Sequence, residues 1–364
     1  MNLAIEAALK HQNYQEVTRL VSELAPEDPW RSFYQAQLHE AEAEGEAAEA
    51  IYREILRQGS LPKLALEARQ GLQRLAQQQQ AQQQQQVAQR QAQVAATTAQ
   101  PGQTEPGVLI LEPVPPEAKS AIAPAFASIM QIEPYSARLL LPSRGWRLYR
   151  TGSVGELQVY GQDLQAAGIP VFWQALSEIK KIKVHQVCYF ETLEDPVRVR
   201  VKAAHSNESP QPMTFKWSDV FQSVTGQLPI FETVVDLDAR GVLQRKEKTQ
   251  DYAQFCDLHL PSGILRFYDE GYQFNQGVPL ADQSVAGTSW GNWQGLTTLW
   301  QRSLPQKPCW SDFAAFADTA IDHPDLLERV DPHINLFRRA DSNWDQMFHL
   351  YSSLAYLRGV QAES

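Results

Sequence analysis

The sequence predicts a multidomain protein of mixed α and α+β class, and three features of the chain support this prediction. Residues 1–76 follow the helical period, residues 77–106 are rich in glutamine, and strand-like segments become frequent from residue 107 onward. A chain of 364 residues is also long enough for two or three domains. We therefore predict a helical domain (1–76), a glutamine-rich linker (77–106), an α/β module (107–182) and an α+β domain (183–360) whose antiparallel sheet carries helices on one side.

The composition argues against several classes of function. The formal net charge is −10, from 42 acidic and 32 basic residues, whereas a dedicated nucleic-acid-binding protein carries a basic excess. The same charge disfavours binding to anionic lipid, and no apolar run approaches the roughly 18–20 residues of a membrane span. Three dispersed cysteines form neither a disulfide framework nor a C-x-x-C metal motif. Because the N-terminus also lacks a signal-peptide pattern, we expect a cytoplasmic protein that binds neither nucleic acid nor membranes.

The N-terminal region has the pattern of two similar helix pairs. Between residues 5 and 24 apolar side chains recur in steps of three and four, and two prolines then end the second helix. The pattern returns after 31 residues, so that Val17 corresponds to Ala48 and Leu24 corresponds to Ile55. A third helical segment within residues 63–76 is expected to cap the stack.

This repeat resembles the tetratricopeptide family, in particular uncharacterised proteins of cyanobacterial type. The family period is 34 rather than 31, and the usual Trp and Gly of its first helix are not in place here. The resemblance implies stacked helix pairs whose concave side binds protein partners. It also implies structural roles for six residues: Tyr14, Val17, Gly45, Ala48, Tyr52 and Ile55.

The glutamine tract is expected to separate two folded regions. Residues 77–100 have too little apolar surface to build a core, but glutamine and alanine are fair helix formers. About thirty residues span roughly 45 Å as a helix and roughly 30 Å as a flexible coil. The sequence leaves both conformations open, and in either one the tract is a spacer.

Residues 107–182 have the order β-α-α-β-α-β. The segments "GVLILEPV" and "IPVFWQAL" are strand-like, and a helix that opens at Ser153 has Glu156 three residues later and closes at Gly168. This order and the phrase "LQAAGIPVFW" resemble the C-terminal domain of the ribosomal stalk protein and the Clp protease adaptor family. That resemblance implies a protein-binding module without catalytic residues.

Strand signals dominate the region that begins at Lys183. The segment "VRVRVKA" alternates apolar and basic residues, and a hairpin is expected around residues 238–241. Residues 261–263 mark a tight turn between two further strands, and the last helix is expected at about residues 343–357. These features predict the α+β domain.

The stretch "QFCDLHLPSG" in this region holds three residue types that occur in active sites and metal sites. Alternate side chains of a strand point to opposite faces, so Cys256 shares a face with Leu258 and Leu260, which favours a buried thiol. Asp257 and His259 share the other face and are candidates for a catalytic dyad or a pair of metal ligands. The more common role of such a pair is to lie on a solvated sheet face.

Two further motifs do not lead to an assignment. The segment from Arg245 onward resembles in part the cyclic-di-GMP-binding PilZ pattern, but a second arginine is missing, His259 replaces a serine, and Gly263 is one residue late. The His-Pro-Asp triplet at 323–325 matches one in Hsp70 co-chaperone J-domains. No lysine or arginine occurs in the helical segment before it, so we do not assign that family.

The sequence therefore favours a non-catalytic adaptor or scaffold that binds protein partners through its N-terminal helices. The α+β domain would supply a second docking or sensing surface, and no cofactor or metal is predicted. The alternative is a small-ligand sensor or an enzyme seated in the α+β domain, using Asp257 and His259 together with His185 or Arg266.

Overall fold

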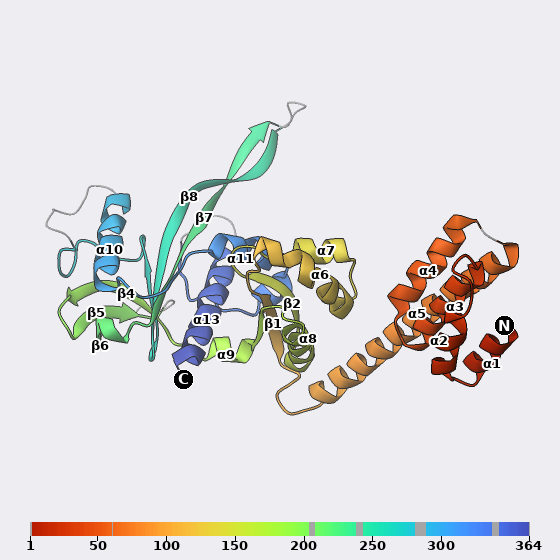
Figure 1. The fold of residues 1–364 in the computed structure, drawn as a ribbon. Helices are drawn as coiled ribbons and strands as arrows, with labels where there is room; N and C mark the ends of the chain where they lie inside the picture. Colours follow the sequence, from red (N-terminus) through yellow and green to blue (C-terminus); the bar gives the residue numbers. More distant parts are fainter. Residues whose placement is uncertain are drawn as a thin grey trace. The chain divides into compact units, whose positions relative to one another are not determined.

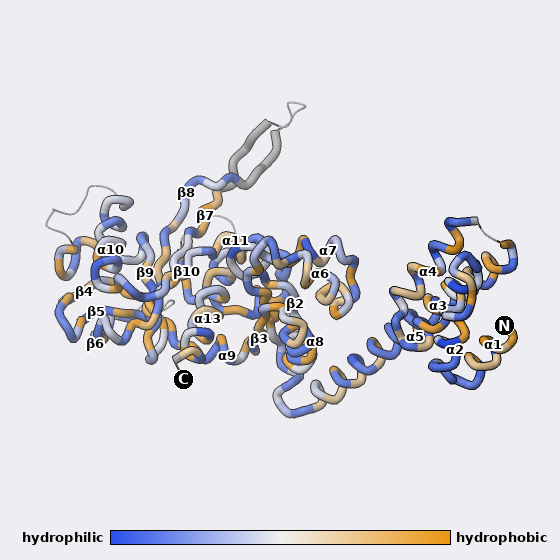
Figure 2. Tube along the Cα trace, viewed as in Figure 1, coloured by the Kyte–Doolittle hydropathy of each residue, from blue (hydrophilic) through white to orange (hydrophobic). Residues whose placement is uncertain are grey.

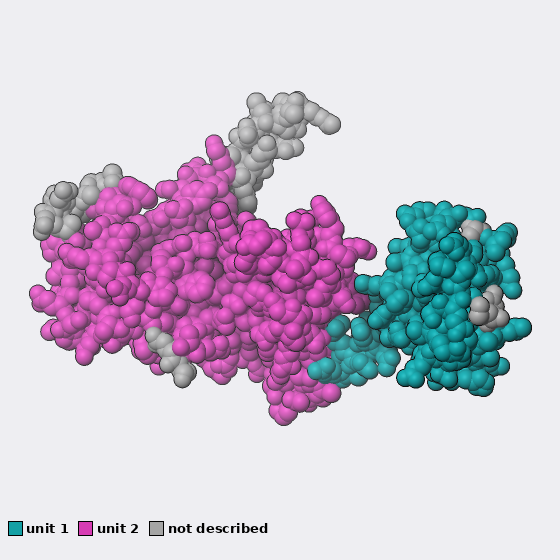
Figure 3. Space-filling model, viewed as in Figure 1, with its two compact units in different colours: residues 1–93 teal, residues 94–364 magenta. Residues whose placement is uncertain are grey.

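The chain forms two compact units in the computed structural model, which describes residues 2–59, 61–203, 208–237, 243–280, 289–336 and 342–363. The units are Met1–Gln93 and Val94–Ser364 (Figure 3), and each has its own hydrophobic core. The mixed α and α+β class is confirmed, because helices build the described part of unit 1 whereas unit 2 contains two sheets (Figure 1). Among the described residues, no helix combines the length and the apolar character needed to cross a membrane.

Unit 1 is a stack of short helices. They are α1 (Asn2–Lys10), α2 (Tyr14–Ser22), α3 (Pro29–Ala41), α4 (Gly45–Gln58) and the first part of α5 (Pro62–Thr98). Asn13 caps α2 by accepting the Glu16 N–H at 3.3 Å. Asp28 caps α3 in the same way, and Pro29 occupies its first turn.

The core of unit 1 uses equivalent positions of the repeat. The residues related by 31 positions are all buried: Val17 with Ala48, and Leu24 with Ile55. Gly71 lets α5 approach α4 closely, because a Cβ at this position would lie only 2.5 Å from the Tyr52 ring. The Tyr52 hydroxyl donates to Glu40 at 2.9 Å, and Arg74 Nε donates to the same carboxylate at 3.0 Å, so that α3, α4 and α5 are joined.

Helix α5 contains the glutamine tract. It runs without interruption over 37 residues, which corresponds to about 55 Å. Its buried residues lie only in the first part: Leu64, Ala68, Gly71 and Leu75. The later turns alternate hydrophilic glutamines with alanines (Figure 2). The tract is thus helical, and its side chains add nothing to the core of unit 1.

Unit 2 begins with a three-stranded antiparallel sheet of strand order β2-β1-β3. The elements follow the predicted order: β1 (Pro106–Leu111), α6 (Pro116–Met130), α7 (Pro134–Leu140), β2 (Arg147–Ser153), α8 (Val154–Ala166) and β3 (Val171–Ala175). Ser153 caps α8 as expected, by accepting the Glu156 N–H at 3.3 Å. Helix α9 (Leu176–Lys180) leads from here to the second sheet.

Seven described strands form the second sheet, in the order β10-β7-β8-β9-β4-β5-β6. They are β4 (Val184–Thr192), β5 (Val197–Lys202), β6 (Gln211–Phe215), β7 (Gln222–Leu237), β8 (Leu243–Leu260), β9 (Gly263–Tyr268) and β10 (Cys309–Trp310). Most neighbours are antiparallel as predicted, but β10 pairs with β7, and β9 with β4, in parallel. Strands β7 and β8 form a long hairpin (Figure 1), whose expected turn at 238–241 lies outside the described residues.

Helices cover both faces of this sheet. On one face α10 (Ser289–Ser303) packs against side chains that include Cys256 and Leu258. On the other face α11 (Phe313–Ala320), α12 (Pro324–Leu327) and α13 (Trp344–Glu363) pack against side chains that include Phe255. The sheet thus differs from the one-sided arrangement expected from the sequence. The physical reason is that strands such as β9 are buried at every position, so that both faces need cover.

The two sheets share a core although the sequence predicted separate domains at 107–182 and 183–360. Val108 and Phe172 of the smaller sheet belong to the same buried cluster as Phe255 of the larger sheet. Trp146 lies between them, with its ring centre 5.0 Å from that of Phe172 and 4.7 Å from that of Trp310. Because α11 contacts both β2 and β7, it supplies apolar surface to both sheets.

Candidate functional site

Polar residues of the seven-stranded sheet gather on the face that α13 covers. The strand register places Asp257 of β8 opposite Arg266 of β9, and Arg266 opposite Gln186 of β4. The next row pairs His259 with Gln222 of β7. Residues paired across strands share a face, so the register gathers these side chains beneath one helix. Asp257, His259 and Arg266 each have 0% exposed surface.

Asp257 and Arg266 form a buried ion pair. Arg266 Nε donates to Asp257 Oδ1 at 2.9 Å, and Nη2 donates to Oδ2 at 2.7 Å, which is the bidentate geometry. Arg266 Nη1 donates to the Pro332 carbonyl at 2.7 Å, and the guanidinium carbon lies 5.2 Å from the Phe348 ring centre. Each charge is thus balanced by the other, and loss of either partner would leave an uncompensated charge in the core.

A chain of hydrogen bonds runs from Trp310 to His259. The Trp310 indole N–H donates to Gln222 Oε1 at 3.0 Å. An indole can only donate, so this contact fixes which end of the Gln222 amide is the oxygen. Gln222 Nε2 then donates to His259 Nδ1 at 2.9 Å, and to the Ala355 carbonyl of α13 at 2.7 Å. His259 therefore accepts at Nδ1 and carries its proton on Nε2.

The chain continues from His259 to the ion pair. His259 Nε2 donates to Ser352 Oγ at 3.0 Å, and Ser352 Oγ donates to Asp257 Oδ2 at 2.6 Å. Every donor between the indole and the carboxylate meets an acceptor. The direction of all these bonds follows from the two ends, since the indole only donates and the carboxylate only accepts.

Burial keeps the histidines of this face neutral. It lowers the pKa of His259 to about 3, and Arg266 adds to this effect whereas Asp257 opposes it. Burial also lowers the pKa of His349 on α13 well below its usual value, with further contributions from Arg266 and His333. A neutral His259 matches the single-proton state that the hydrogen-bond chain requires.

The Asp-His-Ser composition of this cluster does not have the order of a hydrolytic triad. In a triad the histidine lies between the carboxylate and the nucleophile and takes the nucleophile's proton. Here Ser352 lies between Asp257 and His259, and its hydroxyl proton points to the carboxylate. Ser352 has 0% exposed surface as well. The arrangement therefore holds α13 against the sheet and offers no accessible nucleophile.

A cavity of about 470 Å³ adjoins the cluster. Its lining comes from α9, α13 and the segment after α12: Leu176, Ile179, Lys180, Glu328, Arg329, Val330, Asp331, His333 and His349. His333 has φ +49°, a left-handed conformation that is uncommon outside glycine and often marks functional sites. The His333 and His349 rings meet edge to face with centres 4.9 Å apart. Arg266 Nη2 lies 3.5 Å from His349 Nδ1, so the cavity wall contacts the ion pair.

The structure brings together three of the four residues considered for an enzyme or a sensor: Asp257, His259 and Arg266. His185 is not among them, because it pairs with Leu265 on the opposite face of the sheet. The expectation that the Asp257 and His259 face lies in water is wrong, because α13 covers it completely.

The buried-thiol prediction for Cys256 is confirmed. Cys256 lies in the apolar cluster with Leu258 and Leu260, and burial raises the pKa of its thiol well above the usual value. The PilZ-like pattern gains no support, because its His259 is enclosed and the side chain of Arg245 lies outside the described residues.

Several members of the cluster escaped the sequence prediction, namely Gln222, Trp310, His349 and Ser352. A signal for His349 and Ser352 existed in the almost wholly apolar surroundings of "HLYSSLAYL", whereas the segments around Gln222 and Trp310 gave none. A strand or helix that is apolar all round is a buried one, so its polar residues need buried partners.

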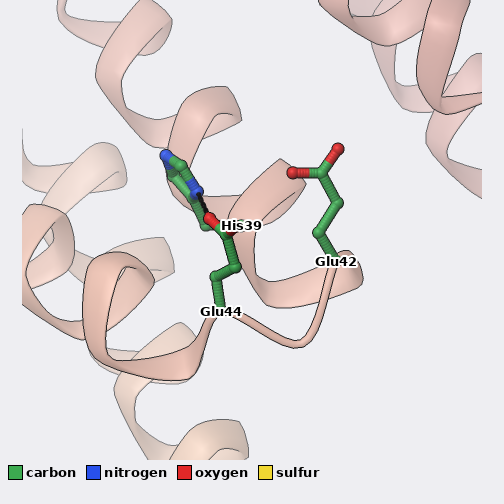
Figure 4. A group of neighbouring side chains, drawn as sticks. All are labelled: His39, Glu42 and Glu44. Atoms are coloured by element: carbon green, nitrogen blue, oxygen red, sulfur yellow. Dashed lines mark hydrogen bonds and ion pairs between the residues drawn. The ribbon is translucent and has the colours of Figure 1, made fainter.

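A second group of ligand-type side chains lies in the turn between α3 and α4. His39, Glu42 and Glu44 each place one potential metal-ligating atom within 4.8 Å of the others. His39 Nδ1 and Glu44 form a hydrogen bond at 2.6 Å, and Figure 4 shows that the Glu42 carboxylate is not part of it. Glu42 and Glu44 are exposed, so this hydrogen bond accounts for the arrangement without a metal.

Comparison with known proteins gives no relative from which a role for these residues can be transferred. No protein-family model, no curated protein and no solved structure matches the chain. The function has to be inferred from the geometry of the two units.

Proposed function

We propose that this protein is a non-catalytic adaptor or scaffold that binds protein partners through unit 1. The observation that carries the proposal is the burial of equivalent positions, Val17 with Ala48 and Leu24 with Ile55, in a stack of helix pairs. Stacked helix pairs present an extended surface on which partner segments lie. The resemblance of the repeat to the tetratricopeptide family supports the same role.

Unit 2 supports a role without catalysis. Its acidic, imidazole and hydroxyl groups at Asp257, His259 and Ser352 are enclosed and hydrogen-bonded to one another. A general base or a nucleophile must reach a substrate, and these groups reach only the underside of α13. The arrangement supports a rigid body that carries a binding surface.

Capture experiments with the full chain, residues 1–93 and residues 94–364 test this proposal. Each piece contains a complete core of its own, so both are expected to fold. We expect residues 1–93 to capture partners of the full chain that residues 94–364 do not capture. The proposal would be contradicted if residues 1–93 captured none of the partners of the full chain.

Exposed apolar side chains of unit 1 provide a sharper form of the same test. Leu3 and Leu66 are 83% and 52% exposed, and serine at both positions in the full chain should weaken capture without loss of stability. Tyr135 on α7 of unit 2 is 75% exposed, so Tyr135→Ser is the matched control and should leave capture unchanged.

The second candidate is a small-ligand sensor, which the cavity beside His333 and His349 favours. The cavity combines exposed Lys180 with buried His349, so a ligand there would contact the polar cluster beneath α13. Thermal unfolding with a panel of metals and nucleotides tests it. A ligand at one hundred times its dissociation constant would stabilise the folded state by about 2.7 kcal/mol. The absence of any shift across the panel would remove this candidate.

A further inference from the structure

Strand β7 has an open edge directly beyond β10. Strand β10 pairs with β7 only at Ser223 and Val224, and no other described strand lies on this edge. The Ser223 N–H donates to the Pro308 carbonyl at 2.9 Å, so it points toward the open side. Backbone groups alternate in direction along a strand, so those of Thr225 and Gln227 point the same way. The parallel pairing of Val224 with Trp310 already uses the Thr225 N–H. The Thr225 carbonyl and both backbone groups of Gln227 lie beyond β10 and can pair with one further strand.

A cavity of about 580 Å³ passes over this open edge. On the α10 face of the sheet it is lined by Thr225, Gln227, Tyr252, Gln254, Trp290, Trp293, Gln294, Thr297 and Trp300. On the other face it is lined by Gly226, Phe255, Phe313, Ala314 and Trp344, and Ser311 follows β10 in the chain. A cavity that touches both faces of one strand must cross the edge between them.

Gly226 shapes the second face of this groove. A Cβ at Gly226 would lie 2.6 Å from the Phe348 ring and 3.0 Å from the Phe313 ring. The two rings therefore pack directly on the β7 backbone, and the groove floor on this side is aromatic.

The chemistry of the lining selects an uncharged ligand with hydrogen-bond acceptors. None of the described residues that line the cavity is charged, although the chain as a whole carries a net charge of −10. The Trp300 indole N–H is buried and has no hydrogen-bond partner within the described part of the chain. Trp290 is 61% exposed and Tyr252 is 51% exposed, which is unusual for large apolar side chains without a partner.

We propose that an extended, uncharged peptide strand of a partner protein binds along the open edge of β7, in line with β10. Its main chain pairs with the Thr225 carbonyl and with both backbone groups of Gln227, and its alternate side chains enter the two aromatic halves of the groove. Peptide recognition by strand addition combines these two elements, because the main chain supplies affinity and the alternating pockets supply specificity. The groove belongs to unit 2, so the inference does not rest on the partner proposed for unit 1.

A peptide strand fits better than a compact small molecule. A small molecule would use the aromatic walls but would leave the Gln227 N–H and the outward carbonyls of Thr225, Gln227 and Pro229 unpaired, and edge groups of this kind are what a further strand satisfies. A charged ligand would meet no opposite charge among the described residues of the lining.

Selection from a displayed library of linear peptides of about ten residues, with the full chain as bait, is the test. We expect enrichment of uncharged, β-branched and aromatic sequences. The affinity of a selected synthetic peptide should fall by about tenfold for Gln227→Pro, which removes one outward N–H, and by less than about threefold for Gln227→Ala, which keeps it. N-methylation of alternate peptide amides should abolish binding.

The aromatic walls have their own controls. Trp290→Ala and Trp300→Phe should each weaken the binding of the selected peptide. Tyr135→Ala should not weaken it, although Tyr135 is more exposed than Trp290. The partners captured by unit 1 should be unaffected by Gln227→Pro, which separates this inference from the proposed function.

Three results would overturn the inference. The first is a selection in which the native chain enriches no peptide more strongly than the Gln227→Pro variant does. The second is equal affinity of the selected peptide for Gln227→Pro and Gln227→Ala. The third is slow hydrogen exchange of the Gln227 amide in the protein alone, because the edge beyond β10 would then be covered already by the chain itself or by a second copy.

Discussion

The two faces of the seven-stranded sheet are stabilised in different ways, although they are made by alternate residues of the same strands. Toward α10, β8 directs Cys256, Leu258 and Leu260 into an apolar cluster. Toward α13, the same strand directs Asp257 and His259 into a closed set of hydrogen bonds. Apolar burial has no preferred direction, whereas each bond of the polar face requires one partner in one orientation.

This difference assigns distinct tasks to the two faces. The α10 face tolerates the replacement of an apolar side chain by another of similar volume. The α13 face admits one position of the helix, because Ser352 and the Ala355 carbonyl must meet partners on two strands. The polar face thus determines where α13 lies, and the apolar face contributes stability that depends mainly on volume.

Removal of one charge from the polar face should have the largest effect on the free energy of unfolding. We expect Asp257→Ala to lower the free energy of unfolding by about 3–5 kcal/mol, because it leaves Arg266 charged and enclosed. Leu258→Ala on the opposite face is the matched control, with an expected loss of about 2–5 kcal/mol from the cavity alone. Urea unfolding followed by circular dichroism measures both.

The double variant Asp257→Leu/Arg266→Met separates these two mechanisms. Removing the second charge should restore about 2 kcal/mol relative to Asp257→Ala, because no unpaired charge remains. If the double variant were no more stable than the single one, the uncompensated charge would not be the cause of the loss.

Acid should weaken the polar face next. His259 has a folded-state pKa of about 3, whereas an unfolded histidine titrates near 6.5, so between these values the unfolded chain binds a proton that the folded chain does not. The free energy of unfolding should therefore be fully retained above about pH 6.5 and fall below it by up to about 1.4 kcal/mol per pH unit for each such histidine.

The slope of the free energy of unfolding against pH, between pH 6.5 and 4.5, identifies the histidine responsible. His259→Gln should reduce this slope, and the remainder should reflect His349, His185 and His323, whose pKa values are also lowered. Equal slopes for the native chain and His259→Gln would contradict a neutral buried His259.

Loss of the central hydroxyl should have a smaller effect. Ser352→Ala removes the acceptor of His259 and one donor of Asp257, and we expect a loss of about 1–3 kcal/mol. Ser353→Ala should cost less, because Ser353 contacts His349 only at 3.4 Å. A cost for Ser353→Ala equal to or above that for Ser352→Ala would show that Ser352 is not the link between histidine and carboxylate.

Thiol reactivity should report whether the apolar face of the sheet is closed, without any substitution that changes stability. Cys188 and Cys256 are buried, and burial raises the pKa of both thiols, whereas Cys309 is exposed. A thiol-specific reagent should therefore label Cys309 first and reach the other two only after unfolding. Fast labelling of Cys256 in the folded protein would show that the apolar face is open.

The sequence predicted local features of this fold better than contacts between distant segments. The alternation along "QFCDLHL" correctly separated Cys256 from Asp257, because a strand period is a local property. The Ser153 cap and the order of the elements around it were predictable for the same reason.

Enclosure of Asp257 and His259 was not predictable in this way, because it depends on a helix that begins more than eighty residues later in the chain. The sequences of β8 and α13 do not indicate that these two elements pack together, although each contains polar residues in apolar surroundings. The open edge of β7 escaped prediction for a related reason. It depends on where the short strand β10 ends, and two residues carry too little periodic signal to be detected.

The hydrogen bonds beneath α13 also constrain the order in which unit 2 can be completed during synthesis. Ribosomes finish β7, β8 and β9 before they begin α13. A nascent chain can therefore assemble the α10 side of the sheet while Asp257 and Arg266 still face water. The arrival of Ser352 and its neighbours converts this intermediate into the finished unit, so a chain that is terminated before α13 would be released with a charged, uncovered sheet surface.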